Sequence, residues 1–349
     1  MEDMMLQQVM TEPGKIEFRE VPVPETGDDQ VLVRIMYIGV CGSDIHVYHG
    51  KHPFTKYPVT QGHEVSGEVV AFGRNVKNLR IGQRVTIEPQ VVCGHCYPCR
   101  HGKYNLCESL KVMGFQTTGT ASTYFAAPAE RVTPIPQTMD FKDGAMIEPL
   151  AVAVHAVRRV GDVTGQNICV IGAGPIGNLV SQVAKALGAG KVMVTDVSDY
   201  RIQLARECGA DAVYNTKEVD FGEAMVECFG PDKADVIFDC AGNDITMGQA
   251  IAHARKGSTI ILVAVYAGMA NVDLAVLNDH ELDLNTTMMY RHEDYVTAIE
   301  LVNAGKIELR KLQSKVFSFK DYLDAYKFID ANREKTMKVL IDVQNGTEK

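Results

Sequence analysis

The stretch Asn167-Ile-Cys-Val-Ile-Gly-Ala-Gly-Pro-Ile-Gly177 decides the fold of a large part of this chain. Its first five residues form a short apolar run that predicts a buried strand, and a helical pattern begins at Pro175 and continues to Leu187. Three glycines occupy the turn between them: Gly172, Gly174 and Gly177. A strand, a tight glycine turn and a helix in this order are typical of one unit of a parallel sheet.

The residues that follow repeat the same alternation. Lys191–Thr195 predicts a strand and Tyr200–Cys208 a helix, and two more apolar runs predict buried strands at Asp235–Asp239 and Thr259–Val263. Repeated units of this length indicate a doubly wound parallel sheet with right-handed crossovers.

The glycine turn predicts a dinucleotide site. Gly172 allows the tight turn, Gly174 lets the backbone approach a pyrophosphate, and Gly177 lets the helix pack closely on the strand. Pro175 and Ile176 open the helix, whose first N–H groups and positive dipole end favour an anion.

Asp196 ends the next predicted strand, where a carboxylate accepts hydrogen bonds from the adenosine ribose and repels a 2′-phosphate. This predicts NAD(H) rather than NADP(H); the alternative role for Asp196 is a helix N-cap. Arg201 follows closely and is a further predicted cofactor residue, one that weakens the expectation of strict NAD preference.

Composition and charge narrow the class of protein. The length of 349 residues predicts two domains of unequal size. The content of 46% hydrophobic and 23% charged residues is typical of a soluble globular protein. The net charge of −9 argues against a nucleic-acid or anionic-membrane surface, whose footprint is basic. No apolar run approaches the roughly 18 residues of a membrane span, and the N-terminus lacks the pattern of a secretory signal. A cytoplasmic enzyme is expected.

The sequence pattern changes near residue 150. Before residue 150, short β-rich runs alternate with Gly/Pro turns and predict a β-rich, barrel-like domain: Gln30–Tyr37, Glu64–Phe72 and Arg84–Glu88. The last sixty residues either extend the parallel sheet or return to the first domain; they predict a helix His292–Asn303, a strand Lys315–Phe319, a helix Lys320–Ile329 and a strand Lys338–Val343.

Four of the nine cysteines fall within fifteen residues: Cys93, Cys96, Cys99 and Cys107. An odd cysteine count without a secretory signal is a poor disulfide framework. Four thiolates at these spacings suit one tetrahedral Zn²⁺ and leave no open position, so a structural ion is predicted. An iron–sulfur cluster is the alternative.

Several further motifs occur in one order along the chain with the cysteines and the glycine turn. The full set is Gly39–His46, Gly62–Glu64, Ile87–Pro89, Cys93–Cys107, Glu148–Leu150, His155–Arg159, Gly172–Gly177 and Thr195–Ser198. In combination, these motifs resemble the zinc-dependent medium-chain dehydrogenase/reductase family, and in particular its sorbitol (polyol) dehydrogenase branch. The resemblance covers nearly the whole chain and implies an α/β protein with a GroES-like catalytic domain over 1–152 and 289–349 and a Rossmann NAD-binding domain over 153–288.

The resemblance also implies a second, catalytic zinc. Cys41, His63 and Glu148 are its implied ligands, and Glu64 binds it directly or through water. Such a set leaves a position for water or the substrate oxygen. By the same resemblance, Glu148 occupies a position where simple alcohol dehydrogenases usually have cysteine, and this lowers the expectation that ethanol is a substrate.

Further roles follow from the same resemblance. Ser43 and His46 are implied to carry a proton out of the pocket, and Asp44 to fix the tautomer of His63. The alternatives are a helix-capping Ser/Asp pair and a surface histidine. Arg291, together with Ser43 and an apolar wall at Phe115, is implied to hold the substrate; its alternative role is an exposed charge at a helix start.

The expected function is the transfer of a hydride between NAD and a secondary hydroxyl of a polyol or sugar-derived alcohol, polyol to ketose. The alternatives are an L-threonine 3-dehydrogenase, a hexonate 5-dehydrogenase and, more remotely, a non-catalytic nucleotide-binding protein on the same scaffold. The resemblance further implies two zinc ions per chain and a homo-oligomer, a tetramer before a dimer.

Overall fold

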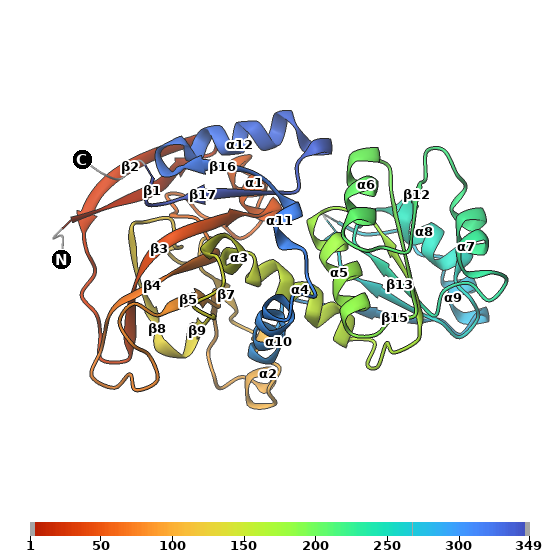
Figure 1. Ribbon diagram of the computed structural model, residues 1–349, viewed down its shortest axis with the longest axis horizontal. Helices are drawn as coiled ribbons and strands as arrows, with labels where there is room; N and C mark the ends of the chain where they lie inside the picture. Colours follow the sequence, from red (N-terminus) through yellow and green to blue (C-terminus); the bar gives the residue numbers. More distant parts are fainter. Residues whose placement is uncertain (1–3, 267, 346–349) are drawn as a thin grey trace. The chain divides into compact units, whose positions relative to one another are not determined.

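The computed structural model describes residues 4–266 and 268–345, and the chain divides into two compact units (Figure 1). The first unit comprises Met1–Glu148 and Gln313–Lys349, and the second comprises Pro149–Leu312. Among the described residues, no helix has the length and apolar character needed to cross a membrane.

A six-stranded parallel sheet forms the centre of the second unit, and it confirms the predicted doubly wound fold. Every neighbouring pair of its strands is parallel. Its order is β12 (Ala212–Asn215), β11 (Lys191–Asp196), β10 (Asn167–Ile171), β13 (Val236–Asp239), β14 (Thr259–Leu262) and β15 (Asp283–Thr286). The order reverses at β10, where the two halves of a doubly wound sheet meet.

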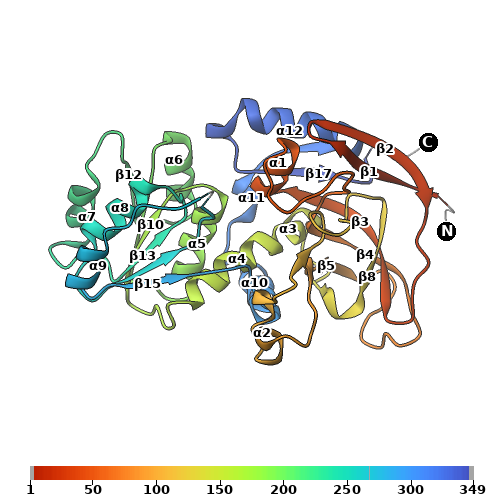
Figure 2. The ribbon, with the colours of Figure 1, turned by 180° about the vertical axis from the view of Figure 1, so that it is seen from behind.

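Helices cover both faces of this sheet (Figures 1 and 2). Helices α5 (Pro175–Ala186) and α6 (Asp199–Glu207) lie on one face, and α7 (Phe221–Phe229) and α8 (Asp244–His253) lie on the other. Alternate residues of β10, including Cys169 and Ile171, pack with α7 and α8 in one apolar cluster. The short helix α9 (Leu274–Asp279) precedes β15.

Residues 289–312 belong to the second unit, whereas the sequence analysis places the end of the NAD-binding domain at residue 288. Asp294 of α10 (His292–Asn303) accepts hydrogen bonds from His155 and Arg158 of α4 (Ile147–Arg158). The Glu308 N–H donates to Gln182 of α5, just before α11 (Leu309–Leu312). These bonds tie 289–312 to α4 and α5.

A seven-stranded sheet forms the centre of the first unit. Its order is β16 (Gln313–Ser318), β17 (Lys338–Asp342), β3 (Gln30–Val40), β4 (Glu64–Phe72), β5 (Arg84–Ile87) and β9 (Val132–Pro134), and β8 (Tyr124–Pro128) also pairs with β3. The C-terminal strands therefore return to the first domain, which settles the alternative that the sequence leaves open.

Smaller elements complete the first unit. Two two-stranded sheets accompany the main one: β1 (Met4–Glu12) with β2 (Lys15–Pro22), and β6 (Gln90–Val91) with β7 (Lys111–Val112). The helices are α1 (Gly42–Tyr48), α2 (Tyr97–Arg100), α3 (Phe141–Ala145) and α12 (Tyr322–Ala331). Phe319, Tyr322 and Tyr326 join the buried valines and isoleucines of β3 and β4 in one core.

Candidate metal and cofactor sites

Cys41, His63 and Glu64 form a cluster in the first unit that can hold a metal ion. One ligand atom from each lies within 4.8 Å of the others. The antiparallel pairing of β3 with β4 explains this, because Gly39 is opposite Glu64 in the register. Cys41 follows β3 and His63 precedes β4, so both come to the same end of the strand pair.

Asp44 lies close to both the Cys41 backbone and the His63 imidazole of this cluster. Its carboxylate is fully buried, accepts the Cys41 N–H at 2.9 Å, and lies 3.6 Å from Nδ1 of His63. Burial lowers the pKa of His63, but the charges of Asp44 and Cys41 outweigh it and raise that pKa well above its usual range. The cluster therefore stabilises positive charge, and its thiolate, imidazole and carboxylate donors suit Zn²⁺.

Lys338 of β17 is the buried counter-ion of Glu64, and it is not among the predicted site residues. Its Nζ lies 2.6 and 2.7 Å from the two carboxylate oxygens of Glu64, and both side chains are buried. Burial lowers the pKa of Lys338, but Glu64, Cys41 and Glu148 outweigh it and raise that pKa. The one signal in the sequence is a lysine at the start of the apolar run Lys338–Val343, since a buried lysine needs a partner.

Glu148 stays outside the group of mutually close ligand atoms. It lies in the first turn of α4, is 7% exposed, and contributes to the charge around Lys338. Glu64, in contrast, adjoins His63 in the chain and opens β4. In this structure the carboxylate that completes the three-residue cluster is thus Glu64, and Glu148 adds a further carboxylate near Lys338.

Ser43 and His46 lie on α1, the helix that follows Cys41, and Phe115 contacts the His63 ring. Ser43 and His46 are three residues apart on α1, so they share one face of that helix. The Phe115 ring lies 4.9 Å from the His63 ring and stacks on His52 at 4.7 Å. Burial lowers the pKa of His52.

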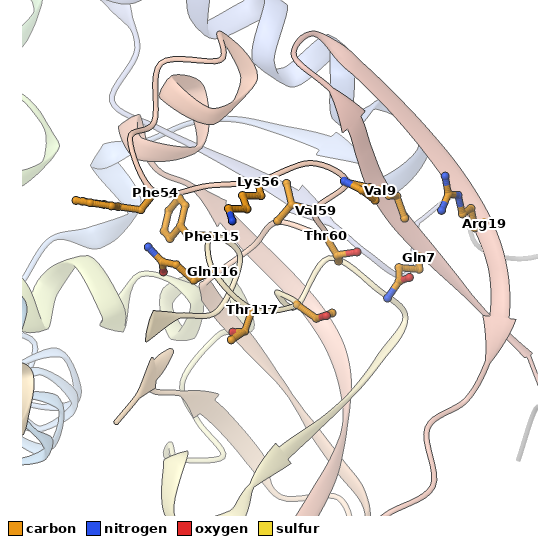
Figure 3. A pocket seen from close by; sticks show the side chains of 12 residues that line it. Gln7, Val9, Arg19, Phe54, Lys56, Val59, Thr60, Phe115, Gln116 and Thr117 are labelled. Carbon is orange, nitrogen blue, oxygen red and sulfur yellow. The ribbon is translucent and has the colours of Figure 1, made fainter. Parts of the chain in front are cut away.

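Phe115 also lines a pocket of about 660 Å³ in the first unit (Figure 3). The predicted apolar wall therefore borders this pocket and also contacts the His63 imidazole.

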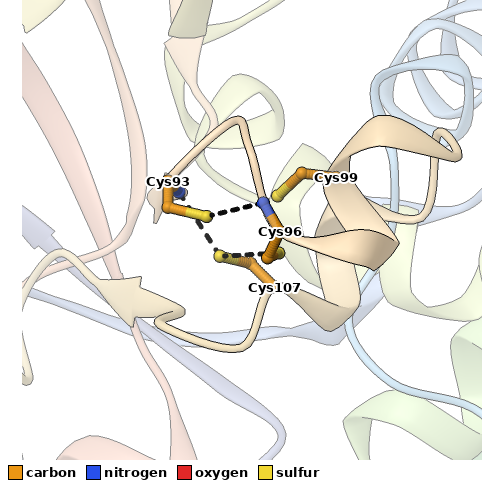
Figure 4. Close-up of side chains that lie close together, drawn as sticks. All are labelled: Cys93, Cys96, Cys99 and Cys107. Atoms are coloured by element: carbon orange, nitrogen blue, oxygen red, sulfur yellow. Dashed lines mark hydrogen bonds between the residues drawn. The ribbon is translucent and has the colours of Figure 1, made fainter.

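The four cysteines of the second cluster converge as their spacing predicts (Figure 4). One sulfur from each lies within 4.8 Å of the others. The backbone follows the same geometry, since the Cys93 N–H donates to the Cys107 sulfur and the Cys96 N–H to the Cys93 sulfur. All four cysteines are free thiols.

Two of these thiols have pKa values that are shifted in opposite directions. Backbone N–H groups of His95 and Cys96 lower the pKa of Cys93 to about 6. Burial and the neighbouring cysteines raise the pKa of Cys99 to about 12. A dication among the four sulfurs would favour the thiolate at each position, so the residues fit a closed, four-sulfur zinc site.

The glycine turn of the second unit has the backbone that a bound pyrophosphate requires. Gly172 has φ +95°, and a Cβ on Gly177 would collide with the carbonyl oxygen of Gly172. Gly174 caps α5, with Pro175 and Ile176 in the first turn. The free N–H groups of this helix start fit a dinucleotide phosphate.

Asp196 and Arg201 lie at the same turn. The Asp196 carboxylate accepts the Ala173 N–H at 2.7 Å and the Val197 and Ser198 N–H groups at 2.8 and 2.9 Å. Ser198, not Asp196, is the N-cap of α6. The Arg201 guanidinium is 4.0 Å from where a Cβ on Gly174 would lie, so it covers the turn.

Arg291 is the N-cap residue of α10, and its side chain is 34% exposed. Its Nη2 lies 3.0 Å from Glu293, whereas its Nε is buried without a hydrogen-bond partner. Its backbone N–H donates to Asp294 at 2.9 Å. The guanidinium is therefore half-buried and retains a free donor.

Comparisons with known proteins identify the family of this chain. Residues 27–137 match the family described as "Alcohol dehydrogenase GroES-like domain", and residues 175–304 match "Zinc-binding dehydrogenase". Sorbitol dehydrogenase 1 of Saccharomyces cerevisiae is 33% identical to the chain, with 95% of this chain and 96% of the relative covered.

Two further relatives differ in the substrates that their names state. The 2-dehydro-3-deoxy-L-galactonate 5-dehydrogenase of Pseudoalteromonas atlantica is 34% identical, with 91% and 92% of the two chains covered. The crystal structure of galactitol-1-phosphate dehydrogenase from Escherichia coli superimposes with a TM-score of 0.89 at 29% identity, with 97% and 100% covered. The chain belongs to the zinc-dependent medium-chain dehydrogenase/reductase family, in its sorbitol dehydrogenase-like branch.

Proposed function

We propose that this protein is a zinc- and NAD-dependent dehydrogenase that transfers a hydride between the cofactor and a secondary hydroxyl of a polyol or sugar-derived alcohol. The observation that carries the proposal is the cluster of Cys41, His63 and Glu64, a three-donor set of the kind that leaves a zinc position open. The glycine turn with Asp196 supplies the cofactor site in the same chain.

Cys41 and His63 are the proposed zinc ligands, with Glu64 as the carboxylate ligand, bound directly or through water. Glu148, in the same group of buried charges, is a further proposed ligand. When bound, zinc makes a substrate hydroxyl more acidic, and NAD accepts the hydride from the carbinol carbon. Asp44 is the proposed orienting partner of the His63 imidazole, because its carboxylate lies 3.6 Å from Nδ1.

Ser43 and His46 are the proposed route for the hydroxyl proton. Both lie on one face of α1, and His46 is exposed while Ser43 is half-buried. A proton received at the Ser43 Oγ can therefore pass towards an imidazole that contacts solvent. Arg291 is the proposed donor to substrate oxygens, supported by its unpartnered Nε.

The four-cysteine cluster is proposed as a structural zinc site, because four sulfur ligands leave no position for substrate. Gly172, Gly174, Pro175, Ile176 and Gly177, with Asp196 and Arg201, are proposed to bind NAD. The carboxylate of Asp196 favours NAD over NADP, since it repels a 2′-phosphate.

The test is reduction of NAD⁺ by the zinc-loaded protein on a panel of hexitols and pentitols, with L-threonine, hexonates and ethanol alongside. We expect turnover of polyhydroxylated substrates and little with ethanol. Cys41→Ser should abolish turnover and remove one zinc. The matched control is Cys208→Ser, which lies outside both clusters and should do neither. Turnover of L-threonine alone would instead assign an L-threonine 3-dehydrogenase. Tight NAD binding without turnover of any substrate would favour a non-catalytic protein.

We also propose a cytoplasmic homo-oligomer, a tetramer before a dimer. All nine cysteines are free, which suits a reducing compartment. Strand β15 is at an open edge of its sheet, and the preceding segment exposes Val265, Met269 and Leu274. Light scattering coupled to size-exclusion chromatography gives the mass that decides between the two states.

A further inference from the structure

The pocket beside Phe115 has an unusual charge for this protein. Two of its lining residues are basic, Arg19 and Lys56, and none of the described residues that line it is acidic. The whole chain carries a net charge of −9, with 44 acidic and 35 basic residues. A pocket with only basic charges in an acidic protein favours an anionic ligand.

Lys56 is the basic residue that is available to a ligand. Arg19 is paired with Glu17 at 3.2 Å, and Glu17 also lies 3.5 Å from Lys15. Lys56 has no ion-pair partner within the described part of the chain, and its side chain is exposed. Figure 3 shows it beside Phe115 and Val59, with Arg19 at the other end of the pocket.

Uncharged polar groups accompany Lys56 around the pocket. Thr60, Gln116, Thr117 and Thr118 line it, and they supply hydroxyl and amide groups. The Thr117 Oγ1 is buried without a hydrogen-bond partner. A buried hydroxyl is rarely left without one, so a ligand with several oxygens would satisfy this group.

Phe115 connects this pocket to the metal cluster. Its ring lines the pocket and also lies 4.9 Å from the ring of His63. Phe54 extends the same wall outwards, because His52 stacks on Phe115 and contacts Phe54 edge-on. A substrate with its reacting hydroxyl near His63 can therefore place its remote end along this wall.

We propose that the pocket receives the anionic end of the substrate, a carboxylate or a phosphate, and that Lys56 is its charge partner. This assignment rests on the proposed function and narrows its substrate class to an acyclic sugar acid or a phosphorylated polyol. Membership of the family does not decide this point, because the relatives' names include a neutral polyol, a sugar acid and a sugar phosphate.

The test compares three substrates of one stereochemistry: a hexitol, its 6-phosphate and the corresponding hexonate. The zinc-loaded holoenzyme is assayed for kcat/KM with NAD⁺ as wild type, Lys56→Met, Lys56→Arg and Lys320→Met. Lys320 is the matched control, an exposed lysine of the first unit that does not line the pocket. Metal content and thermal midpoint verify that each variant is folded.

We expect the wild type to prefer at least one anionic substrate over the hexitol, and the preferred anion distinguishes a carboxylate from a phosphate site. Lys56→Met should lower kcat/KM for that anion about three- to thirty-fold more than for the hexitol, mainly through KM, as expected for a partly exposed charged hydrogen bond. Lys56→Arg should restore most of it, and added salt should weaken the preference in the wild type.

Two results would overturn the inference while leaving the proposed function intact. One is equal use of the hexitol and both anions by the wild type. The other is a loss on Lys56→Met that is the same for charged and neutral substrates, or no larger than that of Lys320→Met. Failure of all three substrates, with simple polyols also inert, would instead overturn the proposed function, and the inference with it.

Discussion

Asp294 offers the sharpest test of how the second unit is held together. Its carboxylate is fully buried and accepts three hydrogen bonds, from His155 at 2.8 Å, from Arg158 at 2.8 Å and from the Arg291 N–H at 2.9 Å. Asp294→Ala removes all three and leaves the buried His155 side chain without its partner.

The expected cost follows from burial. Removing one partner of a buried charged pair costs about 3–5 kcal/mol. The Arg158 side chain is 37% exposed and regains water in the variant, so we expect a loss of about 2–4 kcal/mol in the free energy of unfolding. Asp294→Asn, which keeps one carbonyl acceptor, should lose less.

Urea unfolding followed by circular dichroism measures this loss, since the chain contains no tryptophan. The matched control is Glu293→Ala, whose side chain is 51% exposed and pairs with Arg291 alone among the described contacts, so its loss should stay below about 1 kcal/mol. Equal losses for the two variants, or a loss under about 1 kcal/mol for Asp294→Ala, would refute the reasoning.

The same pair predicts a pH dependence with a definite sign. Burial raises the pKa of Asp294, but the bonds from His155, Arg291 and Arg158 outweigh it and lower that pKa. Its contribution is therefore complete above the unfolded value of about 3.9 and is lost as the pH falls through the lower folded value. The stability difference between wild type and Asp294→Ala should accordingly be constant near neutrality and shrink in strong acid.

Three further predictions concern the metal, the cofactor and the substrate. Metal analysis should give two zinc ions per chain, and Cys99→Ser should remove one of them and lower the thermal midpoint. Iron in the four-cysteine cluster would contradict the zinc assignment. A Cys99→Ser variant with normal stability but no turnover would contradict the structural role. Asp196→Ala should raise KM for NAD and improve the relative use of NADP, and a wild type that already prefers NADP would show that Asp196 has another role. Arg291→Ala should lower kcat/KM for polyols about ten- to a hundredfold with little effect on a short secondary alcohol, and equal losses on both would make Arg291 structural.

Local patterns were sufficient for the elements with a strong apolar run or helical period. The predicted strands Asn167–Ile171 and Glu64–Phe72 and the predicted helix His292–Asn303 agree with β10, β4 and α10 at both ends. Apolar periodicity and turn residues decide these elements within the segment itself. In the parallel sheet, strands β12 and β15 were not predicted, and their short, partly exposed sequences explain why.

The sequence by itself determined the parts of this protein whose residues are close neighbours in the chain. The four cysteines converge because fifteen residues can wrap one ion, and the glycine turn forms because a strand, three glycines and a helix follow one another.

Only the tertiary structure decided that Glu64, and not Glu148, joins Cys41 and His63 in one close group. It also decided that Lys338 pairs with Glu64 across 274 positions and that the second unit extends to Leu312. These features depend on strand pairing and buried charge between distant segments. Local periodicity carries no information about such partners, because the free energy that joins them arises only when the chain is packed.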